Sequence, residues 1–441
     1  MGASLAMTAV KRSRVRLLIV TMLFIATTIN YADRATLSIA GPSLAKDLGL
    51  DAVAMGYVFS AFAWSYVLAQ LPGGWLLDRY GAKWVYAGAI FLWSAFTLMQ
   101  GAVGFFTGFT AVAVLFGLRL LVGLAEAPVF PANARITAAW FPTAERGTAS
   151  AFFNSSQYFA TVLFTPLMGF VVHHYGWHHV FTLMGALGIA FALLWTQVIH
   201  GPKEHPAINQ GERDYIEAGG ALLDMDGRDA GVAQVDAGRT IRQLLANRML
   251  LGIYVGQYCI TTLTYFFLTW FPVYLVKERG LSILQAGFAA VLPALCGFVG
   301  GILGGWISDR LLKRGYSLTA SRKIPIVGGM LLSMVIVGCN YVATDALVVG
   351  LMALAFFGKG VGALGWAVVS DTSPRQGGGL SGGLFNTFGN TAGITTPIAI
   401  GYIVQQTGSF NGALVFVGMN ALVAVFCYLV VVGEIRRVEL R

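Results

Sequence analysis

Long apolar stretches separated by short polar segments cover almost the whole chain. Each is close to the roughly 20 residues that a helix needs to cross the hydrocarbon core of a bilayer. They lie near residues 17–40, 54–77, 84–104, 108–131, 147–171, 179–199, 249–275, 284–307, 323–343, 346–370, 378–403 and 411–433. The pattern predicts an all-α membrane protein with twelve transmembrane helices, grouped six plus six.

The one long polar stretch, residues 200–248, is rich in Asp, Glu, Gly and Arg. We interpret it as a cytoplasmic linker between an N-terminal six-helix half, residues 1–199, and a C-terminal six-helix half, residues 249–441. A short amphipathic helix is expected around Glu212 to Leu223.

The distribution of basic residues predicts the orientation. Of the 29 Lys and Arg residues, 23 fall on the side of the two termini, three fall inside spans, and only Lys46, Lys277 and Arg279 fall on the opposite side. Because short cytoplasmic segments carry the excess of positive charge, both termini of this multi-pass membrane protein are expected in the cytoplasm.

Composition supports a membrane protein and excludes several other classes. The chain is 56% hydrophobic and 11% charged, whereas soluble domains carry about 25% charged residues. The net charge of +9 does not indicate nucleic-acid binding, because the basic residues lie in short segments between apolar runs. The four cysteines lie inside apolar runs without CxxC spacing, so no disulfide framework or zinc site is expected. No metal or cofactor is predicted, and a membrane enzyme is disfavoured because no nucleophile–base pair or metal-ligand set is present.

A short motif occurs once in each half. Residues 73–81 read GGWLLDRYG and residues 304–310 read GGWISDR, each after the second span of its half. The duplicated motif resembles the loop motif of the major facilitator superfamily, whose two pseudo-symmetric halves enclose the substrate. The pairs Asp78–Arg79 and Asp309–Arg310 are expected to form a charge lock at the cytoplasmic gate; the alternative is simple anchoring by positive charge.

A closer resemblance extends over nearly the whole chain. The segments that carry it are 30–40 (NYADRATLSIA), 119–128 (RLLVGLAEAP), 356–360 (FFGKG), 365–367 (GWA) and 383–386 (GLFN). They are similar to the anion:cation symporter family, and most of all to its glucarate/galactarate transporters, which import C6 aldarates with protons. Related members of that family carry hexonates or hexuronates.

Five charged residues lie inside predicted spans, where charge is costly and usually functional. They are Asp33, Arg34, Arg119, Glu126 and Lys359. Asn30, Tyr31, Asp33 and Arg34 fall within roughly 160° of one helical face, at about 100° per residue, so that face does not point at lipid. These charges either form structural ion pairs or bind substrate and protons, and for Arg119 with an acid both interpretations stay open.

The family resemblance assigns roles to these positions. Asp33 and Glu126 match proton-handling acids, and a movable pairing with an Arg such as Arg119 would let them take up and release protons. Arg34 suits a carboxylate anchor because a guanidinium forms two parallel hydrogen bonds. The positions that match the substrate cavity are Tyr31, Arg34, Tyr66, Gln157, Gln257, Trp366 and Asn386.

A diacid requires a second cation, and Lys359 is the candidate in the second half. It lies seven residues before Trp366, so a continuous helix would place both on one face, two turns apart. The alternatives are that Lys359 pairs with Glu126 or lines a packed, Gly-rich helix crossing.

The resemblance therefore implies a proton-coupled symporter of the bacterial inner (plasma) membrane that imports D-glucarate or galactarate by alternating access, and we expect it to be a monomer. The remaining alternatives are an importer of a hexonate or hexuronate monoacid, such as galactonate, and a substrate sensor that does not transport.

Overall fold

Every described secondary-structure element is a helix. The computed structural model describes residues 12–142, 145–223, 237–374 and 378–439, and no strand occurs among them. The elements of the first half are α1 (Val15–Leu48), α2 (Ala52–Tyr80), α3 (Ala82–Gln100), η1 (Val103–Phe105), α4 (Gly108–Glu126), α5 (Val129–Trp140), α6 (Arg146–Tyr175) and α7 (Trp177–Val198). Along the chain, the two halves are joined by a segment that contains α8 (Gln210–Ala218) and α9 (Ala237–Ala246). The elements of the second half are α10 (Arg248–Tyr265), η2 (Phe266–Trp270), α11 (Phe271–Lys277), α12 (Ile283–Ala289), α13 (Val291–Lys313), α14 (Leu318–Ser333), η3 (Met334–Tyr341), α15 (Asp345–Val361), α16 (Gly365–Thr372), α17 (Gly378–Thr407), α18 (Asn411–Phe426) and η4 (Cys427–Val431).

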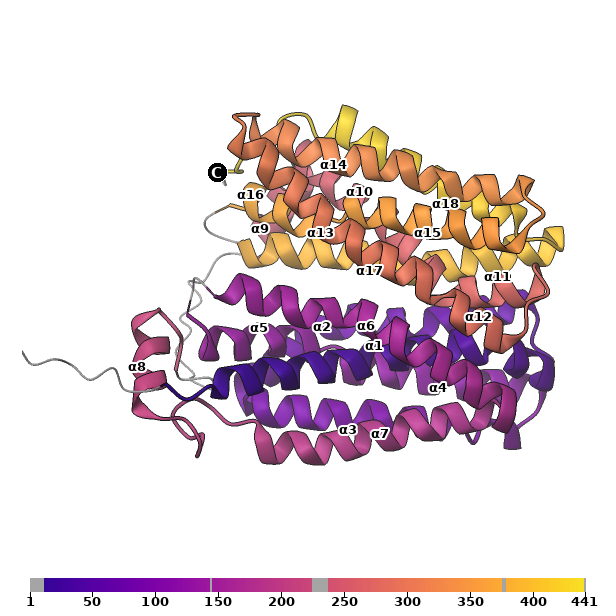
Figure 1. Ribbon diagram of the computed structural model, residues 1–441, viewed down its shortest axis with the longest axis horizontal. Coiled ribbons are helices and arrows are strands. Elements are labelled where there is room, and N and C mark those ends of the chain that lie inside the picture. The colour runs from indigo at the N-terminus through magenta and orange to yellow at the C-terminus, as the bar shows by residue number, and fades with distance from the viewer. Residues whose placement is uncertain (1–11, 143–144, 224–236, 375–377, 440–441) are drawn as a thin grey trace, which may run out of the picture.

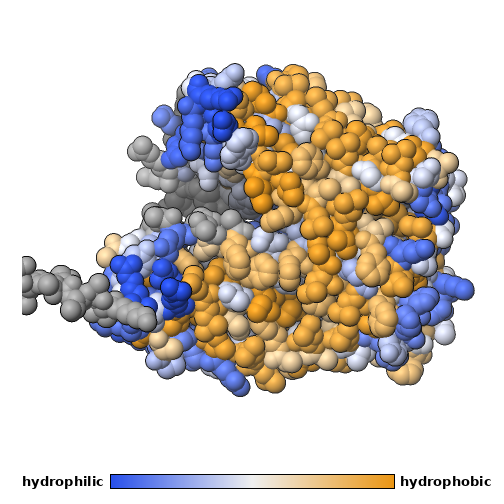
Figure 2. Space-filling model, in the orientation of Figure 1, coloured by the Kyte–Doolittle hydropathy of each residue, from blue (hydrophilic) through white to orange (hydrophobic). Residues whose placement is uncertain are grey.

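Eleven helical segments among the described residues are long and apolar enough to cross a membrane. They coincide with eleven of the predicted spans, and several consist of two consecutive helices, such as α4 with α5. The remaining predicted span is α17, which has 30 residues and is therefore long enough, but its Asn and Thr residues lower its hydropathy. Figure 2 shows an apolar band around the middle of the molecule and polar side chains at both ends.

The helices form two layers, α1–α7 in one and α10–α18 in the other (Figure 1). The end where α1 begins and α8 lies is called the linker end here, and the end where α1 finishes at Leu48 is called the far end. Neighbouring spans run in opposite directions, so residues from different spans can be ordered between these two ends.

The two halves share an apolar core only toward the far end. There, one cluster combines Leu48 and Trp177 of the first half with Tyr274 and Phe410 of the second. Nearer the linker end, two separate clusters form, and each takes its buried residues from one half. The halves are thus joined at the far end and separately packed at the linker end.

Glycines allow close helix crossings at the joined end. A Cβ on Gly56 of α2 would lie 2.6 Å from the Pro397 carbonyl oxygen of α17, and a Cβ on Gly401 would lie 2.6 Å from the Ala52 carbonyl oxygen. On the other side of the molecule, the Thr165 hydroxyl donates to the Gly287 carbonyl at 3.1 Å. These close contacts hold the two halves together at the far end.

The part of the linker that contains α8 is attached to the first half, whereas α9 packs against α10 and α17 of the second half. Glu212 is fully buried and accepts hydrogen bonds from the backbone N–H of Val15 at 3.0 Å and from the Ser13 hydroxyl. It also pairs with Arg16 at 3.2 Å, so it caps the exposed N–H groups where α1 begins. The helix predicted over Glu212–Leu223 exists as α8 but ends at Ala218, because Gly219 and Gly220 follow and Gly220 has φ +83°. Helix α9 was not predicted.

Candidate functional site

The centre of the first half contains a buried ion pair between α1 and α4. Arg34 Nε lies 2.8 Å from Glu126 Oε2, and the two side chains are 8% and 0% exposed. One terminal nitrogen of Arg34 and the second oxygen of Glu126 have no partner. The prediction that these two residues are buried functional charges agrees with their position, and the sequence did not show that they pair with each other.

Aromatic rings surround the Arg34 guanidinium. Its central carbon lies 4.5 Å from the ring centroid of Phe62, 5.0 Å from that of Tyr66 and 5.2 Å from that of Tyr31. Cation–π contacts stabilise the guanidinium without consuming its hydrogen-bond donors. The unpartnered nitrogen of Arg34 can therefore donate to a ligand carboxylate.

Asp33 and Arg119 form a second charged group beside this pair. Asp33 lies on a different face of α1 from Arg34. Its Oδ2 accepts a hydrogen bond from the Thr97 hydroxyl of α3 at 2.7 Å, and its Oδ1 has no partner. Arg119 is buried, interacts electrostatically with Asp33 and Glu126, and forms no salt bridge among the described residues. Of the two interpretations left open for Arg119, the structural ion pair with an acid is not present among the described residues in this conformation.

A polar chain crosses between the halves near the same level. Asn386 of α17 donates to Gln70 of α2 at 2.9 Å, Asn390 donates to Asn386 Oδ1 at 3.0 Å, and Tyr265 donates to Asn390 Oδ1 at 3.1 Å. Of this chain, sequence reasoning found only Asn386; the signal for the others was a polar side chain inside an apolar span.

The remaining predicted cavity residues form no hydrogen bond with this chain among the described residues, although Gln257 adjoins Gly389, which lies between Asn386 and Asn390 on α17. Gln257 of α10 donates to Thr261 at 3.1 Å, and Gln157 of α6 donates to the Asn154 carbonyl at 3.3 Å, so both amides bond within their own helices. Trp366 is 57% exposed, and its ring centroid lies 5.0 Å from that of Phe385. The structure does not bring these three side chains into contact with Arg34.

Lys359 is a buried cation without a counter-ion among the described residues. It is 7% exposed, and its Nζ lies 5.1 Å from the Phe356 ring centroid. The alternative that it pairs with Glu126 is wrong, because Glu126 pairs with Arg34. The alternative of a Gly-rich helix crossing applies to the residues on either side of Lys359. A Cβ on Gly358 would lie 2.5 Å from a carbonyl oxygen of α14, and a Cβ on Gly360 would lie 2.3 Å from a carbonyl oxygen of α13.

Lys359 points toward the interface between the halves. Phe356, over which it lies, contacts the Gly297 position of α13, and Tyr158 of α6 in the first half adjoins the same glycine. The predicted alignment of Lys359 with Trp366 is wrong, because α15 ends at Val361 and α16 begins at Gly365. Because the helix breaks between Val361 and Gly365, helical spacing no longer places Trp366 on the face that carries Lys359.

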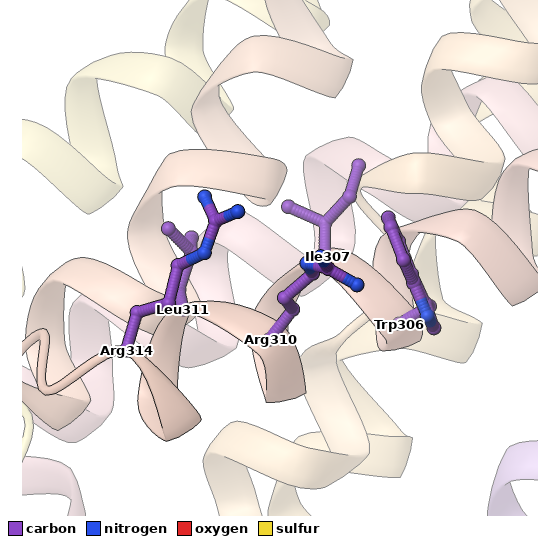
Figure 3. A pocket seen from close by; sticks show the side chains of 5 residues that line it. All are labelled: Trp306, Ile307, Arg310, Leu311 and Arg314. Atoms are coloured by element: carbon purple, nitrogen blue, oxygen red, sulfur yellow. The ribbon is translucent and has the colours of Figure 1, made fainter.

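The gate motifs lie at the linker end. Asp309 is exposed and lies 3.8 Å from Arg322, which binds Asp371 at 2.8 Å, so these ion pairs stay within the second half. Arg310 lies over Trp306, 5.0 Å from its ring centroid, in a surface pocket on α13 (Figure 3).

The matching residue of the first half behaves in the same way. Arg79 lies 5.4 Å from the ring centroid of Trp75, whereas the side chain of Asp78 lies outside the described part of the structure. Among the described side chains, no ion pair of these motifs joins the two halves, in keeping with their separate packing at this end.

Comparison with known proteins agrees with this geometry. Residues 23–321 match the Major Facilitator Superfamily. The chain is 64% identical to the probable galactarate/D-glucarate transporter GudP of Bacillus subtilis (strain 168), over 98% of this chain and 95% of that protein. It is 42% identical to the D-galactonate transporter of Escherichia coli O6:H1, over 98% of each chain.

Solved structures share the fold. A bacterial homologue of the human lysosomal transporter Spinster superposes with a TM-score of 0.75 at 15% identity, covering 96% of this chain and 97% of that one. The D-xylose-proton symporter gives a TM-score of 0.69 at 15% identity, covering 95% and 98%. The predicted fold class and family resemblance are thereby confirmed. The chain is a multi-pass membrane transporter, not an enzyme, and it belongs to the Major Facilitator Superfamily.

Proposed function

We propose that this transporter is a proton-coupled symporter that imports a sugar diacid, D-glucarate or galactarate, into the bacterial cytoplasm. Relatives that are 57–64% identical over nearly the whole chain are named probable galactarate/D-glucarate transporters. The positive-inside distribution of Lys and Arg supports a cytoplasmic linker end in the inner membrane.

The observation that carries this proposal is the presence of incompletely paired, buried cations in both halves, Arg34 with Arg119 in the first and Lys359 in the second. Arg34 has an unpartnered nitrogen inside an aromatic cage, and Lys359 has no acid partner among the described residues. An unpaired buried charge costs several kcal/mol. A ligand with a carboxylate at each end would neutralise Arg34 and Lys359 and would connect the two halves.

Proton coupling follows from the charge of the substrate. An interior-negative membrane opposes the uptake of a dianion by about 4.6 kcal/mol per 100 mV, at about 2.3 kcal/mol for each charge. Two protons per substrate would cancel this charge. The buried acids Asp33 and Glu126 are the two groups in the membrane interior that can carry them.

Alternating access follows from the way the halves pack. We assign residues 1–199 and 249–441 to two bodies that rock about the substrate, with residues 200–248 as the linker. The far end is sealed by glycine crossings, whereas the linker end lacks a core shared by both halves. We infer that this conformation opens toward the linker end, which we assign to the cytoplasm, and we propose that the transporter acts as a monomer.

A monoacid importer is the second candidate, because a relative at 42% identity is named a D-galactonate transporter. A thermal-shift screen of the purified protein with glucarate, galactarate, galactonate and glucuronate separates the two, and uptake into liposomes separates either from a sensor. Glucarate or galactarate is expected to give the largest stabilisation and to accumulate. Stabilisation by galactonate alone would show that the substrate is a monoacid and not a diacid.

A further inference from the structure

The buried face of α3 is polar along most of its length. Its members Tyr86, Trp93, Thr97 and Gln100 are each at most 1% exposed. Thr97 binds Asp33, but the Tyr86 hydroxyl, the Trp93 ring N–H and both amide atoms of Gln100 have no partner. Buried polar groups normally satisfy such atoms with ordered water, so this face requires water inside the first half.

The polar face continues on α1 and α5 toward the linker end. Asn30, fully buried, has no partner for either amide atom and lies beside Glu126. One turn further along α1, Thr27 accepts from Asn133 of α5 at 3.2 Å. Thr137 lies one turn beyond Asn133 and is also buried without a partner.

These residues form one column that runs through the first half and contains both acids. Gln100 ends α3 at the far end, and Tyr86 lies near the start of α3 at the linker end beside Thr27 and Asn133. The 14 residues between Gln100 and Tyr86 correspond to about 21 Å along the helix axis. Asp33 lies between these two levels, one turn from Gln100 through Thr97.

The part of the column from Gln100 to Asp33 is separate from the Arg34 anchor of the proposed substrate site, whereas Glu126 belongs to both because it pairs with Arg34. Adjacent residues of a helix point about 100° apart, so Arg34 faces the aromatic cage while Asp33 faces Thr97 on α3. The second half has no counterpart within its described residues: its buried, unpartnered atoms belong to the scattered Ser321, Asn340, Ser373 and Tyr428, and none of its acids is buried.

We propose that this column is a water-filled proton path through the interior of the first half that reaches Asp33 without passing through the substrate cavity. Its far branch, Gln100 and Thr97, supplies Asp33; its near branch, Asn30 and Asn133, serves Glu126. In the last step the Thr97 hydroxyl donates its hydrogen to Asp33 Oδ2 and accepts one from a water held by Gln100, and that water takes up one proton from the far side. The net result is one proton moved from the far side to the Asp33 carboxylate, which becomes neutral.

This inference rests on the proposed proton coupling, and its test uses the full-length protein in liposomes. Thr97→Val removes the hydroxyl at nearly constant volume, Thr97→Ser keeps it, and Gln100→Leu removes the amide. The matched control is Thr396→Val, which removes another fully buried hydroxyl, in α17. Two rates are measured with glucarate: proton uptake, followed with an internal pH dye, and exchange at equal pH on both sides, which requires no net proton movement.

We expect Thr97→Val and Gln100→Leu to slow substrate-driven proton uptake at least tenfold, with exchange within twofold of the unmodified protein. Thr97→Ser should recover proton uptake to within twofold, and Thr396→Val should change neither rate. Unchanged proton uptake in Thr97→Val and Gln100→Leu would place the path in the substrate cavity and overturn the inference. An equal loss of both rates in Thr97→Val would overturn it as well, because Thr97 would then be structural. If the unmodified protein takes up substrate without protons, the proposed function itself fails.

Discussion

Replacement of Lys359 by Gln tests the proposed recognition of a diacid. Lys359 is 7% exposed and has no salt bridge among the described residues, so a bound carboxylate would be its first counter-charge. Loss of a buried charge partner costs about 2–4 kcal/mol, which corresponds to about a 30- to 1000-fold weaker Kd. Lys359→Gln should weaken glucarate binding by this amount and galactonate binding far less.

The empty transporter provides an internal control for this substitution. Removing an unpaired buried charge does not destabilise a protein in the way that breaking an ion pair does. The Tm of empty Lys359→Gln should therefore equal or exceed that of the unmodified protein, while the stabilisation by glucarate is lost. Lys277→Gln, at the end of α11, is a matched change outside the site.

Calorimetry with both ligands decides the outcome. Equal losses of affinity for glucarate and galactonate, or a fall in the Tm of the empty protein by several degrees, would show that Lys359 supports the fold. The preference for diacids would then require a different cation.

Three further substitutions test other parts of the account. Asp33→Asn should abolish accumulation driven by a pH gradient but keep substrate exchange, because the Arg34 anchor remains; calorimetry that shows lost binding would make Asp33 structural. Gly401→Val would place side-chain atoms against the Ala52 carbonyl, from which even a Cβ would lie only 2.6 Å away, and should therefore open the far end. Unchanged labelling of a cysteine introduced at the far end would refute this. Glu212→Gln should lower the Tm by several degrees, because it weakens the hydrogen bonds at the start of α1 and the ion pair with Arg16. An unchanged Tm would show that this contact does not hold the linker.

The spans could be predicted because lipid imposes a simple length rule on apolar helices. The buried charges of α1 and α4 were also predictable, since no lipid-facing position tolerates them. The pairing of Arg34 with Glu126 was not, because it depends on how α1 and α4 pack. A single sequence does not contain that rotation.

Helix breaks and contacts between the halves account for the other differences. The prediction that Lys359 and Trp366 share a face assumed a continuous helix, and the chain instead leaves the helix between Val361 and Gly365. The link from Asn386 to Gln70 joins residues that are 316 positions apart, and no local pattern indicates it. Neither the helix break nor the contact between the halves leaves a mark in the periodicity of hydrophobic residues along the sequence.

Uptake of labelled glucarate into liposomes that contain only this protein tests the central claim most directly. With an acidic exterior and no other energy source, glucarate should accumulate inside above its external concentration, together with at least two protons per molecule. A protonophore should reduce the internal concentration to the external one. Accumulation that is unaffected by the pH gradient, or net negative charge entering with glucarate, would contradict proton-coupled symport of a sugar diacid.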